Sequence, residues 1–287
     1  MTGSPAIILN EQEKNEKPVV TTIFAVANQK GGVGKTTTSI NLAASLAKMQ
    51  RRVLLVDLDP QGNATMGSGV DKNTLIFGTY EVLTHQCPIR KAIVNAEPAG
   101  YAVLPSNGDL TAAEVELLEV DGKESRMRSA LAEVAVDYDY ILIDCPPSLN
   151  MLTLNGLVAA DAVLIPMQCE YYALEGLSAL SNTIAAIQQA VNPRLRIEGI
   201  IRTMFDPRNN LTMQVSEQLR QHFGDNVYRT VIPRNIRLAE APSHGLPVIV
   251  YDKASTGAQA YLALAGEVLR RGEPQAAAST EQLSSEA

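Results

Sequence analysis

Two lysines, Lys30 and Lys35, lie five residues apart in the glycine-rich stretch 28–38, NQKGGVGKTTT. Glycines allow backbone amides to converge on phosphate oxygens, and the start of a helix adds positive potential there. We therefore expect Lys35 to bridge the β- and γ-phosphates of a nucleotide, Thr36 to ligate Mg²⁺ through its hydroxyl, and Thr37 to add a further donor. The general phosphate loop has a glycine six residues before its lysine, where this chain has Gln29. The general pattern therefore gives no role to Lys30.

Three aspartates stand at the ends of apolar runs. Asp57 and Asp59 lie in VLLVDLDPQGN, and Asp144 lies in YILIDCPPS. A carboxylate that closes a buried strand is costly unless it faces a cation or hydrogen-bond donors. At the carboxyl edge of a parallel sheet beside a phosphate loop, Mg²⁺ with its waters is the natural partner. We expect these three carboxylates near the metal.

Short β-branched runs alternate with helical patterns along the chain, which predicts an α/β fold. The runs are nearly continuously apolar, as in a mostly parallel, twisted sheet with helices on both faces. A helix is expected from Lys35 onward, directly after the glycine loop, and two more over 174–191 and 257–270. The expected strands are 22–28, 53–57, 140–144, 162–166, 197–203 and 227–232.

Composition sets limits on the class of protein. The 287 residues are 46% hydrophobic, enough for a full globular core. The N-terminal stretch does not resemble a secretory signal, and no apolar run approaches a membrane span, so we expect a cytoplasmic protein. Three scattered cysteines predict buried thiols rather than disulfides or a metal site.

Charge is unevenly distributed. Eight arginines, no lysine and four acids lie between Arg194 and Arg237, which makes this segment +4. The overall charge of −7 then leaves −11 for the remaining residues. Global acidity argues against a nucleic-acid partner, but it does not exclude a local basic face.

Four motifs together resemble the ParA/Soj family of chromosome- and plasmid-partitioning ATPases. They are KGGVGKTT, DLDPQGN, ILIDCPPS and IPRNIRLAEAPSHGLPV, in the family's order. The first is typical of the deviant-Walker-A group of P-loop proteins, and the second and fourth favour the ParA branch. The resemblance extends from about residue 22 to 271. It implies a single P-loop ATPase domain over 21–271. The polar composition of residues 1–20 predicts a flexible N-terminal extension, and the Ala/Ser/Glu/Gln-rich stretch 272–287 predicts a disordered tail.

The resemblance gives the early lysine a role. It implies that Lys30 reaches, in an ATP-bound homodimer, the phosphates held by the other subunit, whereas Lys35 acts on its own. It also implies that Asp59 positions or activates the attacking water, that Asp144 acts on Mg²⁺ through water, and that Asp57 supports the metal shell. The implied ATP contacts are Lys30, Gly31, Gly32, Val33, Gly34, Lys35, Thr36 and Thr37, with Met204, Pro233 and Asn235 near the adenine.

The implied function is DNA partition: a nucleoid-associated ATP dimer binds double-stranded DNA without sequence preference, and a ParB-type centromere-binding protein triggers hydrolysis. Non-specific DNA binding needs only cations directed at phosphates. Too few residues precede the first strand for a helix-turn-helix domain, so specific operator binding is not expected. Our candidate DNA contacts are Arg202, Arg208, Arg234, Arg237 and Lys253.

Three other interpretations share the nucleotide core. A ParA-like ATPase that positions a non-DNA cargo is the main alternative. A MinD-like division regulator needs a basic amphipathic C-terminal helix, whereas the stretch EPQAAASTEQLSSEA has no Lys or Arg, so we expect no membrane partner. An electron-transfer protein like the nitrogenase iron protein needs exposed, suitably placed cysteines, and these three match no cluster pattern.

Overall fold

The computed structural model describes residues 21–272. Its strands are β1 (Thr22–Val26), β2 (Val53–Asp57), β3 (Val94–Ala96), β4 (Tyr101–Leu104), β5 (Tyr140–Asp144), β6 (Ala162–Gln168), β7 (Arg196–Phe205) and β8 (Val227–Pro233). Its helices are α1 (Lys35–Lys48), α2 (Asn63–Gly67), α3 (Thr79–Leu83), α4 (Ile89–Ala92), α5 (Leu110–Glu116), α6 (Arg126–Ala132), α7 (Met151–Ala159), α8 (Ala173–Ala190), α9 (Asn210–Phe223), α10 (Ile236–Glu240), α11 (Val248–Tyr251) and α12 (Thr256–Gly272).

The strands form one sheet in the order β3-β4-β2-β5-β1-β6-β7-β8. All neighbours pair in parallel except β3 and β4, which are antiparallel at one edge. The central strand β1 lies between β5 and β6, so the loop that follows it is flanked by the carboxyl ends of both neighbours. Ligands of open α/β sheets bind at this edge.

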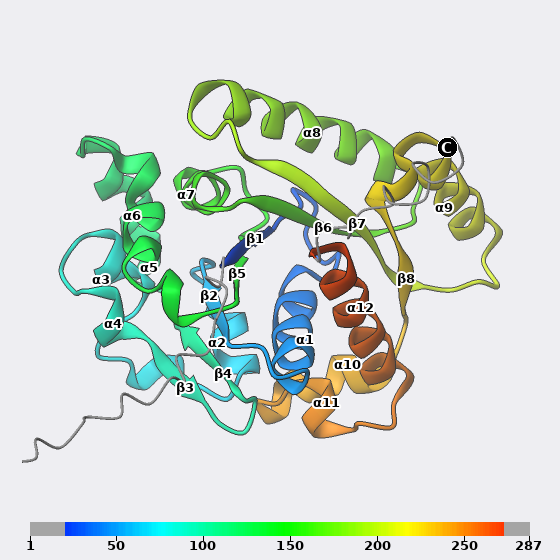
Figure 1. The fold of residues 1–287 in the computed structure, drawn as a ribbon, viewed down its shortest axis with the longest axis horizontal. Helices are drawn as coiled ribbons and strands as arrows, with labels where there is room; N and C mark the ends of the chain where they lie inside the picture. The colour runs from blue at the N-terminus through cyan, green and yellow to red at the C-terminus, as the bar shows by residue number, and fades with distance from the viewer. Residues whose placement is uncertain (1–20, 273–287) are drawn as a thin grey trace, which may run out of the picture.

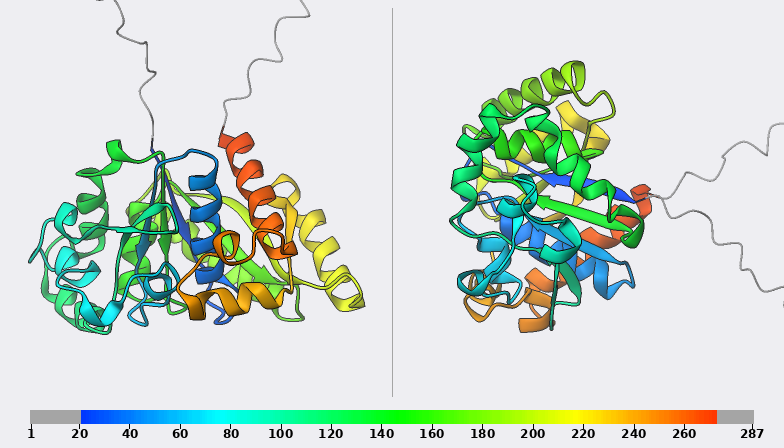
Figure 2. Two further views of the ribbon diagram at one scale, coloured as in Figure 1. Left: turned by 90° about the horizontal axis from the view of Figure 1, so that it is seen from below. Right: turned by 90° about the vertical axis from the view of Figure 1, so that its left-hand side faces the viewer.

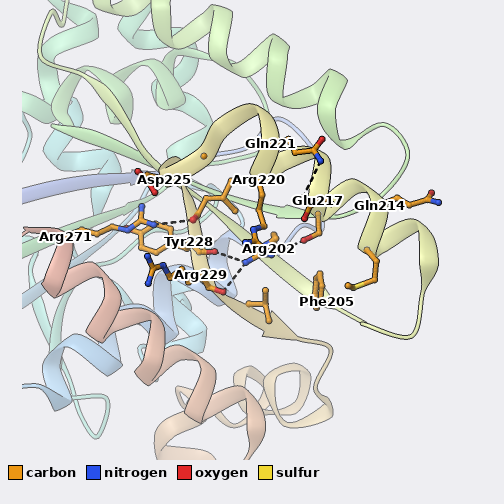
Figure 3. Close-up of a pocket in the computed structure, with 15 residues that line it drawn as sticks. Arg202, Phe205, Gln214, Glu217, Arg220, Gln221, Asp225, Tyr228, Arg229 and Arg271 are labelled. Carbon is orange, nitrogen blue, oxygen red and sulfur yellow. Dashed lines mark hydrogen bonds between the residues drawn. The ribbon is translucent and has the colours of Figure 1, made fainter.

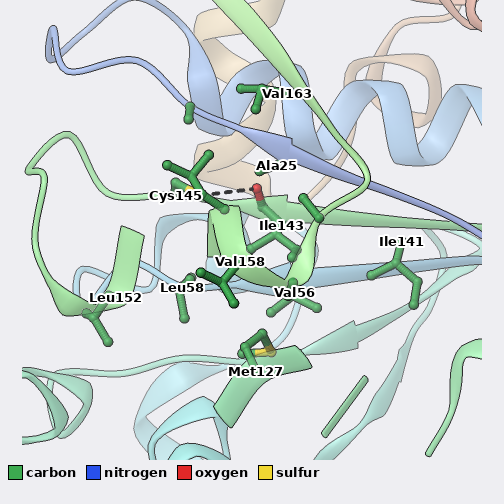
Figure 4. Close-up of a cluster of buried hydrophobic side chains, with 14 of the residues drawn as sticks. Ala25, Val56, Leu58, Met127, Ile141, Ile143, Cys145, Leu152, Val158 and Val163 are labelled. Atoms are coloured by element: carbon green, nitrogen blue, oxygen red, sulfur yellow. Dashed lines mark hydrogen bonds between the residues drawn. The ribbon is translucent and has the colours of Figure 1, made fainter. Parts of the chain in front are cut away.

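Two apolar layers cover the two faces of the sheet (Figure 1). On one face α7 and α8 pack against alternate residues of the strands, and on the other α1 and α12 lie side by side (Figure 2). Figure 4 shows the first layer close to the site: Val56 and Ile143 of the sheet meet Met127 from α6 and Val158 from α7. Burial on both faces explains why the strands read as continuous apolar runs.

The predicted α/β fold is confirmed, and all six expected strands are present with ends shifted by up to two residues. The helices predicted over 174–191 and 257–270 are α8 and α12, and α12 ends at Gly272, one residue into the predicted tail. Strands β3 and β4 were not predicted, because they have only three and four residues. Residues 1–20 and nearly all of 272–287, for which we predicted a flexible extension and a tail, lie outside the described residues.

None of the helices between residues 21 and 272 is long and apolar enough to cross a membrane. The three cysteines, Cys87, Cys145 and Cys169, are buried and unpaired, as expected of thiols that pack as small hydrophobes.

Candidate nucleotide and magnesium site

The glycine loop joins β1 to α1 and places a helix start at the carboxyl edge of the sheet. Gly32 and Gly34 have φ values of +73° and +87°, a left-handed conformation that favours glycine. Within residues 21–272, the amides of residues 31–34 find no acceptor. Unpaired backbone donors are rare in proteins, and those at a helix start are suited to phosphate oxygens. The loop is therefore built to receive an anion.

Lys35 opens α1 and is only 7% exposed. Its Nζ donates to the carbonyl oxygen of Lys30 at 3.2 Å. Burial lowers the pKa of Lys35, and the negative charge of Asp144 opposes that shift. An ammonium group that is largely desolvated gains more from an incoming phosphate than a solvated one would.

Asp144 ends β5 and is fully buried beneath the loop. Its two oxygens accept hydrogen bonds from the hydroxyls of Thr36 and Ser39, both at 2.8 Å. Burial raises the pKa of Asp144 to about 7, and the nearby charge of Asp57 adds to the rise. The carboxylate form therefore needs more positive charge than the loop itself supplies.

These groups fit Mg²⁺ bound together with a nucleotide. Mg²⁺ usually keeps several waters and uses one or two protein oxygens plus substrate phosphates, rather than a cage of side chains. Among the described residues, no group of three or more His, Cys, Asp and Glu could hold a metal ion. The Thr36 hydroxyl and the Asp144 carboxylate, already joined to each other, supply the oxygen donors that such a shared site requires.

Asp57 lies beside Asp144 in the sheet, and its support of the metal shell stays a prediction. Asp57 is fully buried, and its oxygens accept from the amide and hydroxyl of Thr65 and from the amide of Asp59. It therefore holds the loop after β2 in place. Asp59, in contrast, lines the cavity above the glycine loop, and its Oδ1 caps the amide of Gln61 at 2.9 Å.

The raised pKa of Asp144 predicts a pH-dependent stability for the chain without magnesium and nucleotide. The folded protein binds this proton more tightly than the unfolded chain does. Protonation of Asp144 therefore contributes to the stability of the folded protein. This contribution is fully present below the unfolded pKa of 3.8 and is lost as pH rises through about 7. Relative to Asp144→Asn, the wild type should lose on the order of 4 kcal/mol between pH 4 and pH 8. Urea unfolding measures this difference, and parallel pH curves for the two proteins would contradict it.

Two adjoining cavities lie at this edge of the sheet. A cavity of about 620 Å³ is lined by the glycine loop, Asp59 and the segment 146–148. A smaller one of about 170 Å³ is lined by Thr203, Tyr261 and the predicted residues Pro233 and Asn235. Gly34, Thr37 and Met204 line both. The pair has the layout that a nucleotide needs, with a phosphate end and a base end.

The base end is fixed to the phosphate loop by the end of β7. The Thr203 hydroxyl donates to the carbonyl of Val33 at 2.7 Å. Met204 has a φ of +48°, which is uncommon for a residue other than glycine. Its sulfur accepts a hydrogen bond from the side-chain amide of Gln168. Asn235 caps α10, because its Oδ1 accepts from the amide of Leu238 at 3.1 Å. Thr203 and Gln168 were not among the predicted site residues, because their contacts exist only in the folded chain.

Lys30 occupies a different environment from Lys35. Its side chain is 46% exposed, and its Nζ forms an ion pair with the equally exposed Glu170, just after β6. Exposed ion pairs contribute only about 0–1 kcal/mol. Lys30 is therefore free to exchange Glu170 for another anion. Nothing in the sequence around Glu170 indicated this contact.

The five candidate DNA contacts do not form one exposed set. Arg202 is 6% exposed, and its guanidinium donates to the Ser216 hydroxyl and to the carbonyls of Tyr228 and Arg229, so it is not at the surface to meet DNA. Arg202 lies on β7, which pairs with β8, and its side chain bonds to the backbone of β8.

The other four candidates are exposed. Arg208 pairs with Asp206, whose pKa its hydrogen bonds hold at about 2, and Arg237 pairs with Glu240 and Asp252. Within the described residues, the side chains of Arg234 and Lys253 have no hydrogen bond or ion pair. Of the five candidates, these two are the most available to a partner.

A family model described as "AAA domain" matches residues 21–197. The chain is 66% identical over 249 residues to an uncharacterized protein of Pseudomonas putida, and the match covers 87% of this chain and 95% of the relative. It is 53% identical to the chromosome partitioning protein ParA of Myxococcus xanthus over 88% of this chain and 89% of the relative. The sporulation initiation inhibitor protein Soj of Bacillus subtilis is 52% identical over 87% of this chain and 99% of its own.

Solved structures share the fold. A Mycobacterium smegmatis protein, named as a cobyrinic acid a,c-diamide synthase and solved with an ATP analogue and magnesium, superposes with a TM-score of 0.77 at 40% identity. The match covers 88% of this chain and 95% of that one. A putative plasmid partition protein of Borrelia burgdorferi bound to AMPPNP gives a TM-score of 0.74 at 27% identity, over 88% and 99% of the two chains.

Proposed function

The chain belongs to the ParA/Soj family of chromosome-partitioning ATPases, and on that premise we propose that it is an ATP- and Mg²⁺-dependent DNA-partition motor. Two ATP-bound chains form a sandwich dimer that binds double-stranded DNA without sequence preference. A ParB-type centromere-binding partner stimulates hydrolysis and release. The protein works in the cytoplasm, on the nucleoid. The observation that carries the proposal is the pair of lysines in one loop, with Lys35 buried and Lys30 exposed.

Each residue of the phosphate end has a task that its surroundings support. The unpaired amides of the glycine loop and the buried Nζ of Lys35 hold the β- and γ-phosphates. Thr36 and Asp144 hold the magnesium shell, and Mg²⁺, when bound, neutralises charge on the transferred phosphate. Asp59, at the wall of the same cavity, orients the attacking water and accepts its hydrogen bond.

The base end selects by shape. Its small cavity is lined by Met204, Pro233 and Asn235. The hydroxyl of Thr203, which also lines it, donates a hydrogen bond to the carbonyl of Val33 in the glycine loop. A cavity of about 170 Å³ can surround one flat ring system. The amide of Asn235 is already bonded to the Thr256 hydroxyl at 2.9 Å, so its contribution is a fixed wall.

Lys30 supplies the link between nucleotide and oligomeric state. Lys35 already serves the phosphates from within the chain, and Lys30 points instead to the exposed Glu170. We infer that Lys30 leaves Glu170 for the γ-phosphate of the second chain when two chains meet. A cation at that position neutralises charge as the γ-phosphate departs. After hydrolysis the contact is lost, and the dimer separates.

DNA binding is assigned to exposed cations outside the nucleotide site, foremost Arg234. The guanidinium of this residue has no hydrogen bond or ion pair within residues 21–272, although its charge helps to lower the pKa of Asp206. Arg234 follows β8 directly, next to the base end. Pairing two chains doubles the number of such cations, so DNA affinity should depend on ATP. Arg208 and Arg237 can contribute once DNA phosphates replace their acidic neighbours.

DNA binding measured with ATP, with ADP and without nucleotide across a salt series tests the proposal. We expect binding only with ATP, falling steeply as salt rises. Arg234→Glu should abolish ATP-dependent retention in a gel shift and leave the dimer intact in gel filtration. A milder Arg234→Gln should reduce the salt slope by about one or two phosphate contacts per dimer.

Arg51→Glu is the matched control, because Arg51 is an exposed arginine that precedes β2, at the amino edge of the sheet, away from the nucleotide cavities. It should leave DNA retention unchanged. Loss of dimer and DNA binding together in Arg234→Glu would instead make Arg234 a structural residue. Equal DNA binding with ATP and with ADP would refute the motor.

A further inference from the structure

A groove of about 1010 Å³ runs along the edge strand β8, on the far side from the nucleotide cavities, with which it shares no residue. Its walls are α9 and the end of α12 (Figure 3). Four arginines line it, together with two acids. The charged lining residues are Arg202, Arg220, Arg229, Arg271, Glu217 and Asp225.

Two of these arginines are held by the fold. Arg202 is bonded to Ser216 and to β8, and burial lowers its pKa, with the like charge of Arg220 adding to that lowering. Arg271 lies over the ring of Tyr228, 3.9 Å from its centroid, and pairs with Glu267. The fold therefore fixes the position of both guanidinium groups.

The other two arginines have no such support. Arg220 and Arg229 are exposed, and within residues 21–272 their guanidinium groups have no hydrogen bond or ion pair. In Figure 3 the Arg220 side chain extends from α9 towards Arg202, so two cations face one another across the groove. Like charges placed together favour an anionic occupant.

The occupant must bind through side chains, because the backbone of β8 is already engaged. The amides of Arg229 and Thr230 donate to the Glu267 carboxylate at 2.8 and 2.9 Å. The carbonyls of Tyr228 and Arg229 accept from Arg202. A peptide that added to the sheet as a further β-strand would therefore find no free backbone groups at residues 228–230.

The chain itself continues from this groove with an acidic segment. Arg271 lines the groove, and α12 ends at Gly272. Residues 273–287, EPQAAASTEQLSSEA, contain three glutamates and no Lys or Arg. Their one large apolar residue is Leu283, and the end of the groove away from Arg271 is apolar, with Phe205, Met213 and Val231. At about 3.3 Å per residue, the eleven residues from 272 to 283 reach along the whole of β8.

We propose that residues 273–287 dock in this groove, with their glutamates on Arg220 and Arg229 and Leu283 at its apolar end. The segment is tethered to the groove, so its effective concentration there is of millimolar order. Its covalent connection favours this segment over duplex DNA, which has to reach the groove from solution. The docked segment removes two unpaired cations from competition for other polyanions.

The strength of this contact follows from its exposure. Each exposed ion pair contributes about 0–1 kcal/mol, so three glutamates give a weak, salt-dependent contact. Screening shortens the range of charge interactions from about 10 Å at 0.1 M salt to about 3 Å at 1 M. Docking is therefore expected at 50 mM salt and lost at 1 M.

Nuclear magnetic resonance of the arginine Nε–Hε groups in the full chain tests the proposal. The comparison is between wild type and a triple variant, Glu273→Gln, Glu281→Gln and Glu286→Gln. The signals of Arg220 and Arg229 are assigned by their loss in Arg220→Lys and Arg229→Lys. At 50 mM salt the chemical shifts of both signals should differ between the two proteins. At 1 M salt the difference should vanish.

The matched control carries the same charge change in the N-terminal segment: Glu11→Gln, Glu13→Gln and Glu16→Gln. It should leave both arginine signals unchanged. Signals that are identical in wild type and the tail variant at 50 mM salt would overturn the proposal, as would an equal shift in the control. A short DNA duplex that shifts both signals to the same extent in wild type and tail variant would make the groove a DNA surface instead.

Discussion

Lys35→Ala is expected to lower the affinity for ATP by about 10- to 100-fold, the equivalent of one lost hydrogen bond to a charged group. Lys35 is buried at the start of α1, its pKa is lowered by burial, and its Nζ reaches the carbonyl of Lys30 inside the loop. Its removal leaves the phosphate cavity without its internal cation. Calorimetric titration with a non-hydrolysable ATP analogue and Mg²⁺ measures the loss.

Lys48→Ala is the control for this experiment, because Lys48 is an exposed lysine in the last turn of the same helix. It should bind the analogue as the wild type does. An affinity in Lys35→Ala that matches the control would mean that the loop does not hold the phosphates in the way the geometry indicates.

Asp59→Ala is expected to reduce the rate of ATP hydrolysis by about 100-fold or more while leaving ATP binding intact, which is the usual scale for a positioned acid or base. Asp59 lines the cavity in which we propose that the phosphates bind, and its backbone amide donates to the buried Asp57. The variant should accumulate as an ATP-bound dimer that stays on DNA. Steady-state phosphate release together with gel filtration reports both properties.

Asp121→Ala removes an exposed aspartate whose carboxylate has no partner within the described residues, and it should hydrolyse ATP at the wild-type rate. If Asp59→Ala also hydrolyses at that rate, Asp59 has no part in the chemistry. If it fails to bind ATP at all, its role is in forming the loop.

The elements around the nucleotide site could be predicted because their signals are local. The glycine loop, the helix from Lys35 and the strands that end at Asp57 and Asp144 each depend on a few consecutive residues. Buried parallel strands are continuous apolar runs, which made the six long strands visible. Short edge strands such as β3 carry no comparable pattern.

Contacts between distant segments could not be predicted. Arg202 was assigned to a DNA surface on charge alone, whereas the register of β7 against β8 turns it inward onto backbone carbonyls. The partner of Lys30, Glu170, is 140 residues away in the sequence. Asp57 and Asp144 have the same pattern at strand ends, and only the folded chain shows that the hydroxyl of Thr65 donates to Asp57.

In the proposed mechanism ATP joins two chains, each of which gives Lys30 to the nucleotide of the other. Sedimentation equilibrium with Mg²⁺ and a saturating non-hydrolysable ATP analogue tests this directly, with calorimetry to confirm saturation. We predict about twice the chain mass of 30.9 kDa for the wild type, and 30.9 kDa for Lys30→Ala even though it binds the analogue. A saturated wild-type protein that remains at 30.9 kDa would contradict this mechanism.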